Sequence, residues 1–395
     1  PRATRHWRSS ASGWRDGWHY GLMGLPLAFV ALPLYVILPN HYARTFEVPL
    51  ATLGAVLLAA RLFDAAIDPL LGRFSDRLFG RSLRAVLGWG ALACVVLGLG
   101  LALLFFPLVQ GLQALLAWAT ACLLVTYAAF SLASILHQSW GAMLGGNETQ
   151  RSRVVAWREG LGLAGVVLAS ITPVALGLPA MIALFFIALV LGWWAWSQAP
   201  RPTAAGRPLE TDVPPAASWW LPFRRPGYRA LLAVFMVNGI ASAVPATLIL
   251  FFVQDRLQAP PALEPLFLGS YFVCAALAIA LWLRVVARFG LARTWLAGML
   301  LSIAVFVFAA GLGTGDIVPF LAVCALSGVA LGTDPAIPGA LLAGTIDASG
   351  DRGRAEGAYF GWWNFATKLN LALAAGLALP VLGWLGYVPG ARDAD

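Results

Sequence analysis

The chain has 395 residues, of which 60% are hydrophobic and only 11% are charged, and its formal net charge is +8. This composition excludes an ordinary soluble domain, because about a quarter of the residues of such a domain are charged. It is typical of a protein that crosses a membrane many times.

Eleven apolar segments are long enough to cross a bilayer, which takes about 17 to 25 mostly apolar residues. In chain order they lie near 18–38, 48–71, 84–106, 112–140, 154–175, 178–197, 228–254, 264–286, 292–312, 317–345 and 356–385. The predicted fold class is therefore an all-α polytopic membrane protein.

Basic residues outside these segments fall almost entirely in alternate loops. This asymmetry follows the positive-inside rule and predicts a cytoplasmic N-terminus. The positive net charge therefore reflects orientation in the membrane, and we expect no nucleic-acid partner. We expect an integral protein of the bacterial cytoplasmic (inner) membrane, acting as a monomer among membrane lipids.

The second apolar segment contains charged residues within its length. Arg61, Asp64 and Asp68 lie at i, i+3 and i+7, which places all three on one face of a helix. A charged side chain at the centre of a membrane helix costs roughly 2.5 to 3.5 kcal/mol, so such residues are expected to have a function. Carboxylate oxygens are suitable ligands for a hard cation or a proton, so Asp64 and Asp68 predict a site for a monovalent cation. An Arg–Asp pair that only holds helices together is the alternative.

The loop after this segment has the spacing GxxxDRxxGR, formed by Gly72, Asp76, Arg77, Gly80 and Arg81. It resembles the signature between helices two and three of the major facilitator superfamily. That resemblance implies that the glycine allows close helix approach and that the charges form a cytoplasmic gate. A basic loop that only sets the topology is the alternative.

Other charges are predicted inside the membrane. They are Arg158 and Glu159 in the fifth segment, Asp334 in the tenth and Lys368 in the eleventh. Together with the charges of the second segment they make three basic and four acidic residues. One bound cation or proton would neutralise this charge network.

A polar, proline-rich stretch divides the chain. We expect a six-helix bundle over 1–197, a cytoplasmic linker over 198–227 and a second bundle over 228–395, in which five helices are recognisable. Two six-helix halves joined by a linker resemble the major facilitator fold, whose halves are pseudo-repeats. We therefore expect the twelfth helix to be missing by truncation; a native eleven-helix protein is the alternative.

Residues 60–72, ARLFDAAIDPLLG, resemble the cation motif of the glycoside–pentoside–hexuronide:cation symporters, typified by the melibiose permease. This resemblance implies that Asp64 and Asp68 bind a coupling ion, Na⁺ or H⁺. Residues 134–144, SILHQSWGAML, resemble the segment that supplies a hydroxyl and then an acid, which fall on Ser134 and His137. An imidazole in place of the acid favours a proton; a packed structural histidine is the alternative.

The same resemblance implies a solute site. Its candidate residues are Arg158, Trp363, Asn364 and Lys368. The predicted function is a cation- or proton-coupled symporter of a small solute, a sugar or glycoside, working by alternating access, with no cofactor besides the coupling ion. A carrier of an amphiphile such as a lysolipid, or a non-transporting membrane sensor, is the alternative. An enzyme is not expected, since no phosphate loop, HExxH or nucleophile–base pair is recognisable.

Overall fold

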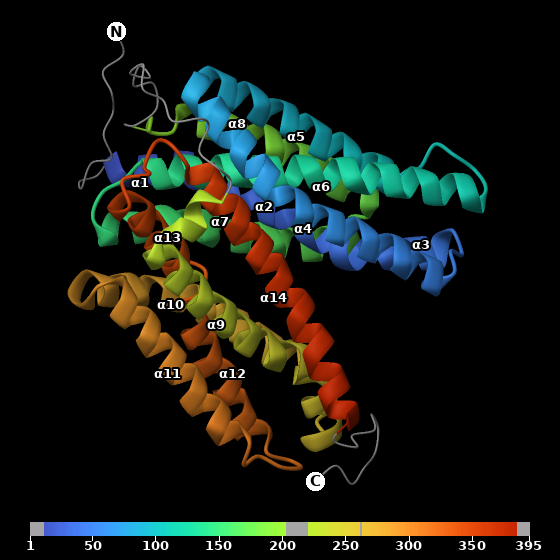
Figure 1. Ribbon diagram of the computed structural model, residues 1–395. Helices are drawn as coiled ribbons and strands as arrows, with labels where there is room; N and C mark the ends of the chain where they lie inside the picture. Colours follow the sequence, from blue (N-terminus) through green and yellow to red (C-terminus); the bar gives the residue numbers. More distant parts are fainter. Residues whose placement is uncertain (1–11, 203–219, 261–262, 385–395) are drawn as a thin grey trace. The chain divides into compact units, whose positions relative to one another are not determined.

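Each apolar segment predicted from the sequence is helical in the computed structural model, which describes residues 12–202, 220–260 and 263–384 (Figure 1). No β-strand occurs in these ranges. The all-α prediction is therefore confirmed. Residues 203–219 of the predicted linker lie outside the described residues.

The chain forms two units. Unit 1 comprises Pro1–Gly146, Arg153–Arg225 and Ala343–Phe365, and unit 2 comprises Asn147–Ser152, Pro226–Leu342 and Ala366–Asp395. Each unit therefore contains a short segment from the other half of the sequence.

The first predicted span of unit 1 is a series of four short helices. These are α1 (Ser12–Gly21), α2 (Gly24–Phe29), the π-helix η1 (Pro33–Ile37) and α3 (Leu38–Thr45). Pro26, Pro33 and Pro39 lie within this span. A proline removes a backbone donor and clashes with the preceding turn, so repeated prolines break the regular hydrogen-bond pattern.

Five long helices complete the first bundle. They are α4 (Leu50–Arg81), α5 (Leu83–Phe105), α6 (Leu112–Met143), α7 (Glu148–Ala175) and α8 (Leu178–Gln198). The Ser82 hydroxyl caps α5 by accepting the Ala85 N–H at 3.1 Å. In unit 1, α6 packs along both α4 and α5, and α8 packs along α5 and α1. Between them lies a core of aromatic and aliphatic side chains, including the paired rings of Trp140 and Trp196, 5.6 Å apart.

Unit 2 contains most of the later helices. After the 3₁₀ helix η2 (Leu221–Arg224) of unit 1 come α9 (Pro226–Phe251), the π-helix η3 (Phe252–Arg256), α10 (Glu264–Phe289), α11 (Leu291–Ala309) and α12 (Ile317–Leu331). Helix α12 packs closely along α10, where Gly328 lies against the Tyr271 carbonyl. Phe267 and Phe320 meet in the core at 5.0 Å.

The tenth predicted span is not one continuous helix. It consists of α12 and α13 (Ile337–Ala348), separated by a turn over residues 332–336. The last helix is α14 (Glu356–Trp384), whose residues up to Phe365 belong to unit 1 and whose remaining residues belong to unit 2.

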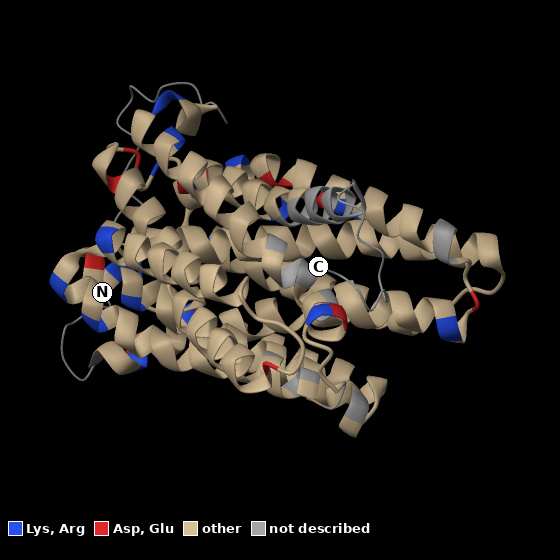
Figure 2. Ribbon diagram, turned by 90° about the horizontal axis from the view of Figure 1, so that it is seen from below, with Lys and Arg blue, Asp and Glu red and all other residues tan. Residues whose placement is uncertain are grey.

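Among the described residues, seven helices are long and apolar enough to cross a membrane. Figure 2, with basic residues blue and acidic residues red, shows that most of the ribbon carries no charge. The few charged residues inside these helices are therefore the first places to look for a functional site.

Candidate functional site

Two carboxylates from α4 lie buried in unit 1. Asp64 is only 1% exposed to solvent, and Asp68 is 0% exposed. The hydroxyl of Ser131 on α6 donates a hydrogen bond of 2.8 Å to Oδ1 of Asp64. The close packing of α4 against α6 thus places the uncharged Ser131 hydroxyl against the Asp64 carboxylate.

A guanidinium and two phenol rings adjoin these acids. The Arg61 guanidinium lies over the ring of Tyr35, 4.7 Å from its centroid, and is close enough to Tyr127 to interact with it electrostatically. The rings of Tyr35 and Tyr127 stack at 6.0 Å. Both acids are close enough to Tyr35 to interact with it electrostatically. We call this group the carboxylate cluster: Tyr35, Arg61, Asp64, Asp68, Tyr127 and Ser131.

The carboxylate cluster holds two acids and one permanent cation. The formal charges of these six side chains sum to −1 when both acids are ionised, and Asp64 and Asp68 also make contacts beyond this group. A bound monovalent cation or a proton would remove this charge. Carboxylate and hydroxyl oxygens can coordinate Na⁺, and either acid can hold a proton.

The two α6 residues singled out in the sequence lie elsewhere on the helix. Ser134 is buried one turn after Ser131, and His137 is 0% exposed. Within the described part of the chain, neither makes a hydrogen bond to Asp64 or Asp68. The α6 hydroxyl that contacts Asp64 is instead that of Ser131, which was not predicted from the sequence.

His137 makes its contacts with the first and sixth spans. Its Nε2 lies 2.8 Å from the Tyr20 carbonyl oxygen, to which it donates, and its ring stacks on Tyr20 at 4.3 Å. The Tyr20 hydroxyl donates back to the His137 carbonyl at 3.1 Å. The Trp196 ring meets the imidazole edge-on at 5.4 Å. These contacts fit the packed, hydrogen-bonded histidine of the sequence analysis.

Arg158 lies on α7, beside the contacts of His137 with Tyr20. It donates two hydrogen bonds to Oε1 of Glu159, at 2.9 and 2.6 Å, and is close enough to the Tyr20 hydroxyl to interact with it electrostatically. Its side chain is 15% exposed. Arg158 and Glu159 therefore neutralise each other on one helix, while Tyr20 joins them to His137.

The predicted solute residues of α14 fall in both units. Trp363 is buried and Asn364 is half-buried in unit 1, the unit that contains Arg158. Lys368 follows one turn after Asn364 and belongs to unit 2.

Two of the predicted gate residues contact the start of α14. The Asp76 carboxylate accepts the N–H groups of Gly357 at 2.6 Å and Ala358 at 2.9 Å. These are among the first N–H groups of α14, which have no partner within the helix and carry its positive dipole end. Gly72 lies against the backbone of Gly357, so that a methyl group at either position would overlap the other helix.

The other three gate residues have open surroundings. Arg77, Gly80 and Arg81 are exposed, and a side chain added at Gly80 would meet no atom within 4 Å. The structure therefore joins Gly72 and Asp76 to α14 and leaves the end of the motif at the surface of α4.

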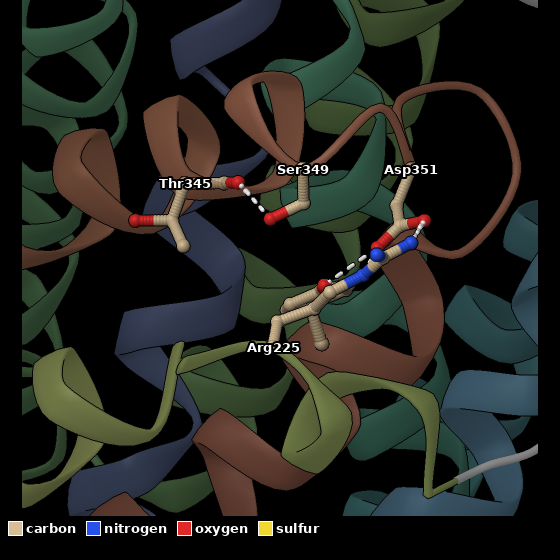
Figure 3. A network of polar contacts seen from close by, with 5 residues as sticks. Arg225, Thr345, Ser349 and Asp351 are labelled. Atoms are coloured by element: carbon tan, nitrogen blue, oxygen red, sulfur yellow. Dashed lines mark hydrogen bonds and ion pairs between the residues drawn. The ribbon is translucent and has the colours of Figure 1, made fainter. Parts of the chain in front are cut away.

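The loop before α14 is fixed by a network of polar contacts, shown in Figure 3. Arg225 makes a bidentate ion pair with Asp351, with distances of 2.9 and 2.7 Å. These hydrogen bonds raise the pKa of the Arg225 guanidinium above its usual value. The Tyr359 hydroxyl donates to Asp351 at 2.7 Å, and Ser349 donates to the Thr345 carbonyl at 2.8 Å. The end of the predicted linker is thus tied to the loop that presents α14 to Asp76.

Asp334 lies in unit 2, in the turn between α12 and α13. Its Oδ1 accepts hydrogen bonds from Trp295 Nε1 at 2.9 Å and from Asn238 Nδ2 at 3.2 Å. It therefore belongs to a separate polar group from the carboxylate cluster of unit 1.

Three hydroxyl residues of the carboxylate cluster, Tyr35, Tyr127 and Ser131, were not predicted from the sequence. A signal for two of them was present, because Tyr127, Ser131 and Ser134 are spaced at i, i+4 and i+7 in an apolar helix. Such a polar stripe indicates the face that meets another polar surface. Tyr35 gave no comparable signal, because the broken first span has no regular period.

Comparisons with known proteins identify the family and the fold. A family described as "MFS/sugar transport protein" matches residues 19–395. The putative glycoside/cation symporter YagG of Escherichia coli K12 is 25% identical over 170 residues, which cover 42% of this chain and only 36% of YagG. The uncharacterized symporter YjmB of Bacillus subtilis 168 is 23% identical over 397 residues, covering 90% of this chain and 80% of YjmB.

Among solved structures, the fucose:proton symporter FucP of E. coli is similar in fold, with a TM-score of 0.68. Its sequence identity is 16%, and the match covers 94% of each chain. This likeness therefore concerns the fold alone.

Proposed function

Because the chain belongs to the MFS/sugar transport protein family, we propose that it is a symporter that couples the entry of Na⁺ or H⁺ to uptake of a small hydroxylated solute. Membership makes it an integral membrane transporter. The relatives YagG and YjmB are both named as symporters, and YagG as a putative glycoside/cation symporter, which supports a sugar or glycoside as the solute. We place it as a monomer in the bacterial cytoplasmic membrane, with its N-terminus in the cytoplasm.

The carboxylate cluster is the observation that carries this proposal. Two acids, both at most 1% exposed, lie on one helix beside a single arginine. Charged side chains inside membrane helices commonly mark ion pathways. We assign the two acids to a coupling ion, because their carboxylates can hold either a proton or a hard cation.

The geometry offers a way to couple ion and solute. A cation at Asp64 and Asp68 would repel the Arg61 guanidinium, which lies on the same face of α4. This repulsion favours positions of the guanidinium in which its donors can meet hydroxyl groups of a solute. A ligand shifts a conformational equilibrium only through differential affinity, and this repulsion makes the affinity for solute depend on the ion.

The other solute contacts remain those of the sequence analysis. Arg158, Asn364 and Lys368 can donate hydrogen bonds to hydroxyl or acidic groups, and Trp363 offers a flat ring for stacking. For the ion we assign the hydroxyl ligand to Ser131, because its hydrogen bond with Asp64 is short. No cofactor is needed besides the coupling ion.

Uptake into proteoliposomes tests the proposal. The purified chain is given radiolabelled pentosides, hexosides and hexuronides with an inward Na⁺ or H⁺ gradient. We expect at least one of these solutes to accumulate, and Asp64→Asn and Asp68→Asn to abolish accumulation. Glu47→Gln is the matched control, since it also turns a carboxylate into an amide but lies exposed before α4. Accumulation that persists in both cluster variants, or no gradient-driven uptake of any solute class, contradicts the proposal.

A further inference from the structure

Unit 2 contains a pocket of its own, between α9, α10, α11 and α12. It encloses about 380 Å³, which falls within the roughly 300 to 1,000 Å³ usual for ligand sites. Most of its lining is apolar and includes Ile249, Phe306, Phe320 and Val323. Asp334 is the acidic residue among the lining side chains.

The pocket adjoins a break in a membrane helix. The sequence GTDPAIPG contains Pro335 and Pro338, which cannot continue a regular hydrogen-bond pattern, and residues 332–336 form a turn there. Non-helical backbone at membrane depth is tolerated where it is buried in protein or lines a cavity. Thr333 and Asp334 of this turn both line the pocket. The break therefore places a carboxylate at the wall of a mostly apolar cavity.

The described neighbours of Asp334 do not balance its charge. Its two donors, the Trp295 indole and the Asn238 amide, are neutral, and both bind Oδ1. In the described ranges of the chain, no Lys or Arg pairs with Asp334, and Oδ2 accepts no hydrogen bond. An acid held in this way within an apolar environment favours a positively charged partner.

We propose that this pocket binds an organic cation with an apolar body, whose positive group pairs with Asp334 Oδ2. The apolar walls would cover the body of such a ligand. The rings of Tyr271, Phe306 and Phe320 among the lining residues offer further faces that attract a cation. This site lies within unit 2 and does not depend on the carboxylate cluster of unit 1.

Binding of two ions of the same shape and opposite charge tests the proposal. Tetraphenylphosphonium and tetraphenylborate are titrated into the full chain in lipid nanodiscs, with binding to protein-free nanodiscs subtracted. We expect saturable binding of the phosphonium only. Asp334→Asn keeps the acceptor for Trp295 and Asn238 but removes the charge, so we expect it to weaken binding about tenfold or more. Asp316→Asn is the matched control, because Asp316 accepts the Gly313 N–H at 2.9 Å outside the pocket lining.

A second variant tests the cavity without changing the charge. Ser302 lines the pocket from α11, and Ser302→Phe should fill the space and abolish phosphonium binding while Asp334 stays intact. Asp64→Asn should bind the phosphonium as well as the unchanged chain, which separates this site from the coupling site. Equal binding of both ions, or phosphonium binding unaffected by Asp334→Asn or by Ser302→Phe, would overturn the proposal.

Discussion

The hydrogen bond between Ser131 and Asp64 joins α6 to the acidic face of α4, with a length of 2.8 Å. A hydrogen bond to a charged group contributes about 1.5 to 3 kcal/mol. The Ser131 hydroxyl stabilises the Asp64 carboxylate when that group is ionised. If the coupling ion is Na⁺, the hydroxyl oxygen can also serve as a ligand of the ion. Its removal therefore has opposite effects for the two ions.

Ser131→Ala is expected to change the apparent affinity for the coupling ion about tenfold. The affinity should rise if the ion is H⁺, because the ionised acid loses a donor, and fall if it is Na⁺, because the metal loses an oxygen. The measurement is the half-saturating ion concentration for uptake in proteoliposomes.

Ser134→Ala is the matched control for this change. Ser134 is also buried on α6, one turn further along, but makes no hydrogen bond to Asp64 among the described residues. A large effect of Ser134→Ala, with none for Ser131→Ala, would contradict the assignment of the hydroxyl ligand to Ser131. It would instead support Ser134, the residue that the family resemblance indicates.

The periodicity of α4 places its charges on one face, but no pattern within one helix identifies which neighbour that face meets. Arg61, Asp64 and Asp68 could be grouped from their spacing alone. The choice of Ser131 over Ser134 depends on the rotation of α6 against α4, which the sequence of α6 does not reveal. The histidine contacts likewise depend on Tyr20, which lies 117 residues away.

At the scale of helices, α4 meets the first turn of α14 through a glycine and an acid four residues apart. Gly72 permits the close approach and Asp76 accepts two N–H groups of α14. The hydrogen bonds of Asp76 depend on the close approach at Gly72, because Asp76 can reach those amides only when the helix backbones are near each other. The remaining glycine of the motif, Gly80, makes no such contact.

Gly72→Ala and Gly80→Ala form a matched pair of variants within α4. A methyl group at Gly72 overlaps the Gly357 carbonyl, so we expect a loss of about 1 to 3 kcal/mol in stability. At exposed Gly80 the change should be neutral or stabilise by up to about 1 kcal/mol, because Ala has the higher helix propensity. Thermal unfolding of the purified protein measures both. Equal effects of the two variants would contradict a close contact between α4 and α14.

The helical spans themselves were largely predictable. All eleven apolar segments form mainly helix in their described residues, because helices satisfy the backbone hydrogen bonds of an apolar segment in lipid. The breaks were not predicted, although Pro26, Pro33 and Pro335 were visible in the sequence. A proline in a membrane helix can produce a kink or a complete break, and the surrounding helices decide between them.

On the scale of the whole chain, each unit borrows a helix end from the other half of the sequence. In unit 1, Asp76 caps an α14 amide 281 residues away. In unit 2, Glu148 Oε2 accepts the Leu291 N–H at the start of α11, at 2.9 Å and 143 residues away. Apolar periodicity predicts helices and loops, but it does not reveal contacts between segments that are far apart in the sequence. The two structural units therefore do not consist of the same residues as the two halves of the sequence.

Division of the chain within residues 203–219 tests this exchange. The fragment 1–202 lacks residues 343–365 and with them the partner of Asp76. We expect it to unfold at lower temperature alone than when it is co-expressed with 220–395. Size-exclusion chromatography and thermal unfolding in detergent measure the difference, with the undivided chain as control. Equal melting of the lone and the paired fragment would show that the borrowed segment adds nothing to unit 1.

The cap on α14 also bears on the order of biogenesis. A ribosome delivers Asp76 to the membrane first and must add another 281 residues before Gly357 follows. During that interval the Asp76 carboxylate lacks the α14 amides that it accepts in the folded chain. Contact between α4 and α14 can form only after both helices have been synthesised.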